Sequence, residues 1–135
     1  MQKKFTPEVI TSLAKDEIFV FGSNLAGVHG AGAARLAYQR FGAIWGKGEG
    51  LMGLSYALPT KDTDIETRSL EHIGYSVIRL IDCCYANPDK TFLVTKCGCG
   101  LAGLRVQDIA PLFKTQSSLP TNLVLPREFH DIIYS

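Results

Sequence analysis

Three polar residues of this chain carry side chains whose chemistry suits catalysis. Lys61 ends a short apolar run, and a partly desolvated lysine amine is a nucleophile toward carbonyl groups. His29 lies inside a glycine-rich run, where we expect its ring to stay outside the core and either transfer a proton or simply contact a ligand. The amide of Asn24 suits a sugar hydroxyl, although asparagine equally often closes a turn. These three residues are the candidate catalytic residues.

Two glycine-rich runs accompany these residues, at positions 19–34 and 92–104. Each follows a short apolar segment and precedes a predicted helix. Such a turn lets backbone N–H groups approach an anion closely, and the N-terminus of the following helix adds a favourable dipole. Two of these turns on one sheet would hold both ends of a diphosphate. The candidate ligand-binding residues are Gly22, Ser23, Asn24, Gly30, Ala31 and Gly32 in the first run, and Gly98, Cys99, Gly100, Leu101, Ala102 and Gly103 in the second.

The distribution of the glycines favours a binding site over a bare scaffold. All thirteen glycines except Gly74 lie within positions 22–53 and 98–103. Glycine loses more conformational freedom on folding than any other residue, so a scaffold without a ligand has no physical need for so many beside two strand ends.

Strands and helices are predicted to alternate along the chain. Thr6 and Pro7 are typical of a helix N-cap and first helical position, which predicts a short helix to about Ala14. Apolar residues at i, i+3, i+4 and i+7 predict the longest helix over 66–86. The glycine-rich segment 42–53 is predicted to be a loop. The other expected elements are strands at 17–21, 55–59, 91–95 and 122–125, and helices at 30–41, 106–113 and 127–133.

This alternation predicts an α/β fold, a single three-layer α/β/α domain over residues 1–135 with a mainly parallel sheet. In such sheets ligands bind outside the carboxyl ends of the strands. Both glycine-rich runs and Lys61 follow predicted strands. The fold would therefore bring them to one edge of the sheet.

Composition narrows the classes of protein to consider. A net charge of +1 argues against strong attraction to polyanions. No segment approaches the roughly 18 apolar residues of a membrane span, and the basic N-terminus lacks the apolar region of a signal peptide, so we expect a cytoplasmic protein with no membrane partner. The four cysteines form an adjacent pair and a C-x-C pair, which is typical of reduced thiols rather than of a disulfide framework or a zinc site. We expect no metal and no cofactor.

Three segments resemble the macrodomains, a family whose fold binds ADP-ribose. The run NLAGVHGAGAARLA at 24–37 resembles the first phosphate-binding motif of that family. CGCGLAGL at 97–104 resembles the second phosphate loop in the G-C-G-L form found in an ADP-ribose glycohydrolase and in antitoxins that remove ADP-ribose from DNA. YALPTK at 56–61 is similar to the strand that carries the catalytic lysine of that subgroup. The resemblance covers roughly 17–113 and extends to uncharacterised bacterial and phage proteins.

The resemblance implies that ADP-ribose or a related nucleotide diphosphate binds between the two loops. It leaves three functions open: a hydrolase that removes ADP-ribose from protein, nucleic acid or a metabolite, a non-catalytic reader, and an interaction protein that has kept the fold without the ligand. Two enzyme subgroups place an aspartate at positions that are Ala34 and Ala102 here. The strand ending in G-D-I, whose aspartate binds adenine in most macrodomains, has no counterpart near Asp16.

Overall fold

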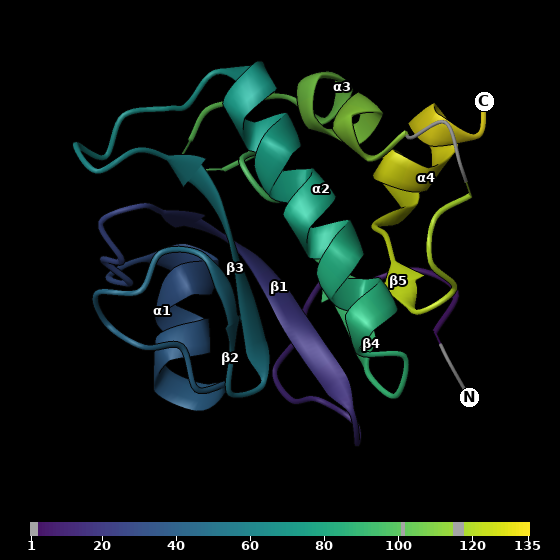
Figure 1. Cartoon of the computed structure of the whole chain (residues 1–135), viewed down its shortest axis with the longest axis horizontal. Coiled ribbons are helices and arrows are strands. Elements are labelled where there is room, and N and C mark those ends of the chain that lie inside the picture. The colour runs from purple at the N-terminus through teal and green to yellow at the C-terminus, as the bar shows by residue number, and fades with distance from the viewer. Residues whose placement is uncertain (1–2, 101, 115–117) are drawn as a thin grey trace.

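The fold is taken from a computed structural model, which describes residues 3–100, 102–114 and 118–135. The described residues form a five-stranded sheet in the order β2-β3-β1-β4-β5 (Figure 1). Strands β1, β3, β4 and β5 run parallel, and β2 at the edge is antiparallel to β3. The predicted α/β class with a mainly parallel sheet is confirmed. The strands are β1 (Glu17–Asn24), β2 (Gly50–Met52), β3 (Ser55–Lys61), β4 (Thr91–Val94) and β5 (Leu123–Val124).

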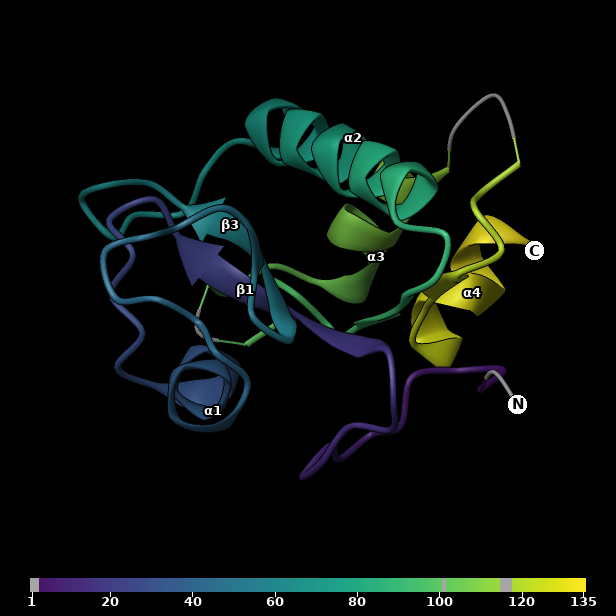
Figure 2. The same cartoon turned by 60° about the horizontal axis from the view of Figure 1, so that its bottom comes forward.

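Helices lie on both faces of this sheet, as Figure 2 shows with α1 on one side of β1 and β3 and α2 on the other. The alternation of side chains along β1 divides the core accordingly. Ile18 and Val20 belong to the larger core under α2, whereas Phe19 and Phe21 belong to the smaller core with α1. The helices are α1 (Gly32–Arg40), α2 (Leu70–Ala86), α3 (Val106–Ile109) with the following 3-10 turn η1 (Ala110–Phe113), and α4 (Arg127–Ile133).

The chain leaves the two central neighbouring strands in opposite directions. From β1 it passes to α1 on one face, and from β4 it passes to α3, which packs against η1 and α4 of the larger core on the other face. Where the connections of adjacent parallel strands diverge in this way, the carboxyl ends of the strands have room for a ligand between them. The two glycine-rich runs are these diverging connections.

The helix predicted at 6–14 is wrong, because the segment is irregular in the structure. The Thr6 side chain donates a hydrogen bond to the Val124 carbonyl at 3.1 Å, and the Thr6 N–H donates to the Leu125 carbonyl at 2.9 Å. Thr6 therefore binds the end of β5 and the residue that follows it, and does not cap a helix.

Several boundaries also differ from the sequence prediction, and β1 and β3 continue to Asn24 and Lys61, beyond their expected ends at 21 and 59. Segment 42–53, predicted as a loop, contains the edge strand β2, which is held by its pairing with β3. Helix α2 begins at Leu70 because Ser69 is its N-cap and accepts a hydrogen bond from the His72 N–H at 3.2 Å. Helix α1 begins at Gly32 and not at Gly30. None of the helices in the described residues combines the length and apolar character that crossing a membrane requires.

Two glycines let the loop after β1 pack backbone against backbone on segment 42–53. A Cβ on Gly27 would lie 2.3 Å from the Gly46 carbonyl carbon, and a Cβ on Gly48 would lie 2.2 Å from the Asn24 oxygen. The Ser23 hydroxyl also donates to the Gly48 carbonyl at 2.6 Å. These glycines are required by packing alone, whether or not a ligand is present.

We expect Gly48→Ala to destabilise the protein by about 3 kcal/mol, because the added methyl group meets backbone that cannot move aside as a side chain could. Urea denaturation measures the loss. The matched control is Gly46→Ala, whose Cβ meets no described atom within 4 Å but whose φ of +92° strains an alanine. The control should lose only about 1 kcal/mol. Equal urea midpoints for Gly48→Ala and the unchanged protein would contradict this packing.

Candidate functional site

A cleft of about 400 Å³ lies at the carboxyl ends of β1, β3 and β4 and brings both glycine-rich runs together. Of the residues predicted from the sequence, it is lined by Gly22, Ser23, Asn24, Gly30, Ala31, Gly32, Lys61, Gly98, Gly100 and Ala102. His29, Cys99 and Gly103 are not among its lining residues, and Leu101 lies outside the described residues.

The two runs come together at the cleft because their backbones approach closely. A Cβ on Gly22 would lie 3.2 Å from the Gly98 nitrogen and 3.4 Å from the Cys97 Cα atom. Beside them, the Thr95 hydroxyl donates to the Val20 carbonyl at 2.7 Å, which joins the end of β4 to β1. Gly22 is therefore needed for the approach of one loop to the other.

Two other glycines in the cleft have no such structural reason. Neither Gly30 nor Gly100 has a positive φ. A Cβ on either residue would meet no described atom within 4 Å. Both line the cleft, one from each glycine-rich run. Since glycine costs conformational entropy on folding, glycines that the fold does not need point to a close approach by something that the chain itself does not supply.

The N-terminus of α1 opens into the same cleft. The cap residue Ala31 has no side-chain hydrogen bond to offer, and the first turn carries no acidic residue. Ala31, Gly32 and Ala33 all line the cleft. The N–H groups of a first helical turn lack partners within the helix and bear the positive end of its dipole. This arrangement suits an anion.

The charged side chains of the cleft are both lysines. Lys61 ends β3, is partly exposed, and takes part in none of the ion pairs found among the described residues. Lys96 follows β4 and pairs with Glu128 at 2.5 Å and Glu8 at 3.4 Å, and the hydrogen bond with Glu128 raises the pKa of Lys96. No carboxylate is among the described residues that line the cleft. Lys61 is therefore the charged lining residue without an ion-pair partner among the described residues, and no described lining residue offers a carboxylate as a general base.

Ala34 and Ala102, the two positions singled out from the sequence resemblance as lacking an aspartate, face this cleft. Ala34 is 8% exposed at the N-terminal end of α1, and the Ala102 carbonyl accepts a hydrogen bond from the Thr67 hydroxyl at 2.8 Å. Acid–base chemistry at these positions would have to come from another residue or from the ligand.

Asn24 is engaged with its own loop. Its amide nitrogen donates to the Val28 carbonyl and its amide oxygen accepts from the Val28 N–H, both at 2.9 Å. Of the two roles considered from the sequence, the structure shows the turn-closing one. The amide holds Val28 in place at the edge of the cleft.

The expectation that the His29 ring stays outside the core is wrong. His29 is 1% exposed and packs against Phe21, with ring centroids 5.6 Å apart. Its Nε2 lies 2.9 Å from the Ile44 carbonyl and 3.1 Å from the Lys47 carbonyl, and since a carbonyl only accepts, Nε2 carries the proton. Its Nδ1 is buried with no partner among the described residues. The ring is enclosed by segment 42–53, which the sequence pattern did not place against it.

The cysteines of the second run are not activated thiols. Cys97 lines the cleft but is 2% exposed, and burial raises its pKa to about 12. Burial also raises the pKa of Cys99, whose side chain packs against the larger core and donates to the Cys97 carbonyl at 3.7 Å.

Gly103 closes the turn of the second glycine-rich run, and its N–H donates to the Gly100 carbonyl at 2.9 Å.

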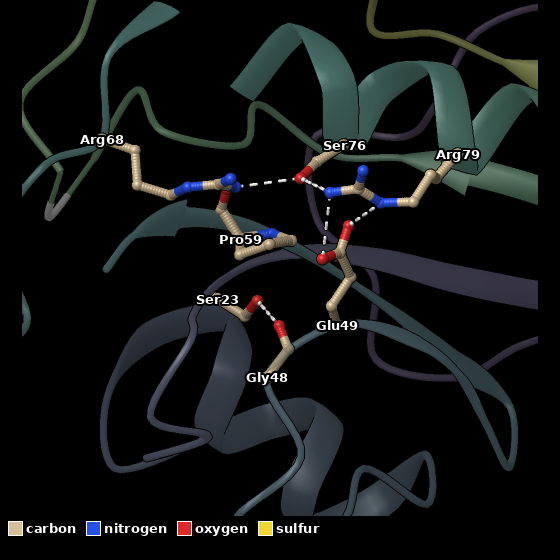
Figure 3. Close-up of polar contacts among 7 residues, drawn as sticks. All are labelled: Ser23, Gly48, Glu49, Pro59, Arg68, Ser76 and Arg79. Atoms are coloured by element: carbon tan, nitrogen blue, oxygen red, sulfur yellow. Dashed lines mark hydrogen bonds and ion pairs between the residues drawn. The ribbon is translucent and has the colours of Figure 1, made fainter. Parts of the chain in front are cut away.

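A polar network holds the β3 wall of the cleft against α2 (Figure 3). The buried Ser76 hydroxyl of α2 accepts from Arg68 Nη1 at 2.9 Å and from Arg79 Nη2 at 3.0 Å. Arg68 Nη1 also donates to the Pro59 carbonyl at 2.8 Å, two residues before Lys61. Arg79 binds Glu49 through Nε at 2.9 Å. The end of β3 and the segment before β2 are thus fixed to the same helix.

Sequence reasoning missed several lining residues and a neighbouring cavity. Val28, Thr60, Ile65 and Thr95 also line the cleft. The two threonines lie at the carboxyl ends of parallel strands, Thr60 within β3 and Thr95 just after β4. The rule that ligands bind at the carboxyl ends of parallel strands (the strand-end rule), applied residue by residue, would have found them. A second, more apolar cavity of about 280 Å³ shares Ala33, Thr95 and Lys96 with the cleft. Its other lining residues are Thr6, Pro7, Glu8, Val9, Ile10, Phe19, Leu36 and Pro126.

We expect Asn24→Ala to lower stability by about 1 kcal/mol, because two hydrogen bonds to Val28 are lost. Asn24→Asp keeps the acceptor for the Val28 N–H but turns a carboxylate oxygen toward the Val28 carbonyl, so it should lose at least as much. Thermal unfolding without any ligand measures both. An Asn24→Ala variant as stable as the unchanged protein would show that the amide does not hold this loop.

No protein-family model, curated protein or solved structure matches the chain. What the cleft binds therefore has to follow from its own residues and geometry.

Proposed function

We propose that the cleft binds ADP-ribose or a closely related nucleotide diphosphate, with the diphosphate between the two glycine-rich runs. The observation that carries this proposal is the pair Gly30 and Gly100. Both line the cleft, and neither has a positive φ nor a described neighbour that a Cβ would meet. One such glycine in each run suits a ligand that both backbones approach closely. The macrodomain resemblance of the same runs supports ADP-ribose as that ligand.

The charge of the cleft supports a phosphate ligand. The uncapped N-terminus of α1 presents N–H groups, Lys61 adds a positive charge, and no carboxylate stands among the described lining residues. A diphosphate brings two negative charges that hydrogen bonds from backbone N–H groups stabilise without side-chain movement.

The adjoining cavity supports a ligand with an apolar, planar end. It is lined largely by apolar residues such as Phe19, Ile10 and Leu36, and it meets the cleft at Thr95 and Lys96. An adenine base placed there would lie beside the Glu8 carboxylate, which can accept from an exocyclic amine. The irregular segment at 6–10 would then serve the adenine end, in place of the missing G-D-I strand.

A binding protein without catalysis is the function that the geometry supports best. Asn24 is occupied by Val28 and His29 is enclosed in the core, so two of the three candidate catalytic residues are engaged elsewhere. Ala34 and Ala102 supply no general acid or base.

Hydrolysis of an ADP-ribosyl linkage on protein or nucleic acid is the second candidate function. It is favoured by Lys61, which lines the cleft and forms no ion pair with any described residue. A lysine amine in such a setting can attack the anomeric carbon of the ribose, and the protein or nucleic-acid group leaves with a proton as the ring opens to a Schiff base with Lys61. Water then hydrolyses the Schiff base, which releases ADP-ribose and restores the free amine.

Isothermal titration calorimetry with ADP-ribose, ADP and AMP tests the binding proposal directly. We expect low-micromolar binding of ADP-ribose, weaker binding of ADP and weakest binding of AMP. ADP lacks the distal ribose of ADP-ribose, and AMP lacks one phosphate as well. An absence of heat with all three ligands would overturn the proposal.

We expect Gly30→Ala and Gly100→Ala to weaken ADP-ribose binding by about tenfold or more while leaving stability unchanged or raised by about 0.5 kcal/mol. The added methyl group meets no described atom, so it costs the fold nothing and obstructs only the ligand. Calorimetry and thermal unfolding on the same samples separate the two effects. Unchanged affinity in both variants would remove the main support for the site.

Lys61→Arg and Lys61→Ala separate binding from hydrolysis. Arginine keeps the positive charge but cannot form a Schiff base, so we expect it to bind ADP-ribose about as well as lysine does, whereas alanine should bind several-fold more weakly. Release of ADP-ribose from modified protein and from modified DNA is measured alongside. If the unchanged protein releases ADP-ribose and Lys61→Arg does not, the hydrolase is established. If the unchanged protein releases no ADP-ribose, the non-catalytic binding protein remains as the proposed function.

A further inference from the structure

The turn between Lys61 and Thr67 forms one side of the cleft and is tightly fixed at its base. Lys61 and Thr67 form an antiparallel bridge, and the Asp62 N–H donates to the Glu66 carbonyl at 2.8 Å. Asp62 Oδ1 accepts from the N–H groups of Asp64 at 2.8 Å and Glu66 at 3.0 Å. The Thr67 hydroxyl bonds the Ala102 carbonyl, which joins this turn to the second glycine-rich run.

This turn holds Ile65 in a conformation that isoleucine rarely adopts. Ile65 has a φ of +62°, and the other non-glycine residue with a positive φ in the described chain is Asp16 at +65°. Aspartate tolerates this region, whereas a β-branched residue is strained there. Ile65 is also 42% exposed, so burial of its side chain contributes little free energy to offset the backbone strain. Folding alone does not explain an isoleucine at this position.

Ile65 lines the cleft together with a second exposed β-branched residue, Val28. Val28 is 41% exposed and is held by both hydrogen bonds of the Asn24 amide. Each residue thus stands on a turn fixed by a neighbouring polar side chain, Asn24 for one and Asp62 for the other. In a cleft lined mainly by glycine and small or polar residues, these two supply exposed branched carbon surface.

The sheet order determines which end of a bound ligand would meet Ile65. The apolar cavity adjoins the cleft at Thr95 and Lys96, which follow β4. Ile65 follows β3, and β1 lies between β3 and β4. A nucleotide diphosphate with its base in that cavity and its diphosphate over the end of β1 would place whatever is attached beyond the diphosphate beside β3.

We propose that Ile65 is a specificity-determining residue that packs, together with Val28, on the carbon face of a sugar attached to the distal phosphate. This inference rests on the proposed function. A furanose ring presents C–H groups as well as hydroxyls, and branched aliphatic side chains pack on such a surface. Contact with the sugar compensates for the strain at Ile65, as is common for strained residues at binding sites.

Ile65→Gly tests the proposal because it relieves the strain and removes the contact at once. Thermal unfolding should show a rise in Tm of about 2–4 °C. Calorimetry should show ADP-ribose binding weakened by about tenfold, with ADP affinity unchanged within about twofold, because ADP lacks the distal sugar. Val28→Ala, which leaves the backbone bonds to Asn24 in place, should weaken ADP-ribose binding by about threefold.

Asp16→Gly is the matched control, since it places glycine at the other described non-glycine residue with a positive φ, in the turn that precedes β1, and Asp16 is not among the residues that line the cleft. Asp16→Gly should leave the affinities for ADP-ribose and for ADP unchanged.

The outcomes distinguish this inference from the proposed function. If the unchanged protein binds neither ADP-ribose nor ADP, the proposed function fails and this inference fails with it. If the unchanged protein binds ADP-ribose and Ile65→Gly binds it equally well, only this inference is overturned. Equal weakening of ADP and ADP-ribose by Ile65→Gly would also overturn it, because the side chain would then not distinguish the sugar.

Discussion

The geometry of the cleft depends on backbone packed against backbone beside the end of β1. Gly27 and Gly48 let the loop after β1 lie directly on segment 42–53, at separations that leave no room for a Cβ. The same packing encloses His29 and brings the Gly48 carbonyl to Ser23. Because one side of the loop packs on segment 42–53, its position is fixed, and its other side forms a wall of the cleft.

Glycines in this chain therefore serve two different purposes that look alike in the sequence. Gly27, Gly48 and Gly22 allow close approach of the chain to itself. Gly30 and Gly100 have no such neighbour among the described residues and face the cleft. Glycine content alone indicates the segments that line the cleft, and the space around each glycine then distinguishes those that packing requires from those that the proposed binding role would explain.

The parts of the fold that the sequence predicted have local signals. Strands β1, β3 and β4 are short buried apolar runs, and α2 carries a long apolar stripe, so their own residues determine them. Thr6 was misread because its partner Val124 lies 118 positions later. The edge strand β2 exists through its pairing with β3, and no periodicity in three residues reveals that.

The same distinction applies to the candidate site. The strand-end rule placed Lys61 and both glycine-rich runs at one edge of the sheet, because parallel strands share their carboxyl edge. His29 was misplaced because its surroundings come from segment 42–53, which crosses over it. The positive φ of Ile65 occurs in the turn that the Asp62 side chain closes, and no pattern of residue types around 65 indicates it.

Polar side chains around the cleft mostly bind their own backbone, and this limits how a ligand can be recognised. Ser23, Asn24, Asp62 and Thr67 each hold a loop through a carbonyl or N–H group. Under the proposed function, recognition falls to backbone N–H groups, to the Lys61 charge and to the carbon surface of Val28 and Ile65. Loops ordered during folding need little rearrangement on binding, which lowers the entropic cost of association. A cleft of this kind distinguishes ligands by where their charge and carbon surface lie, more than by individual hydroxyl groups.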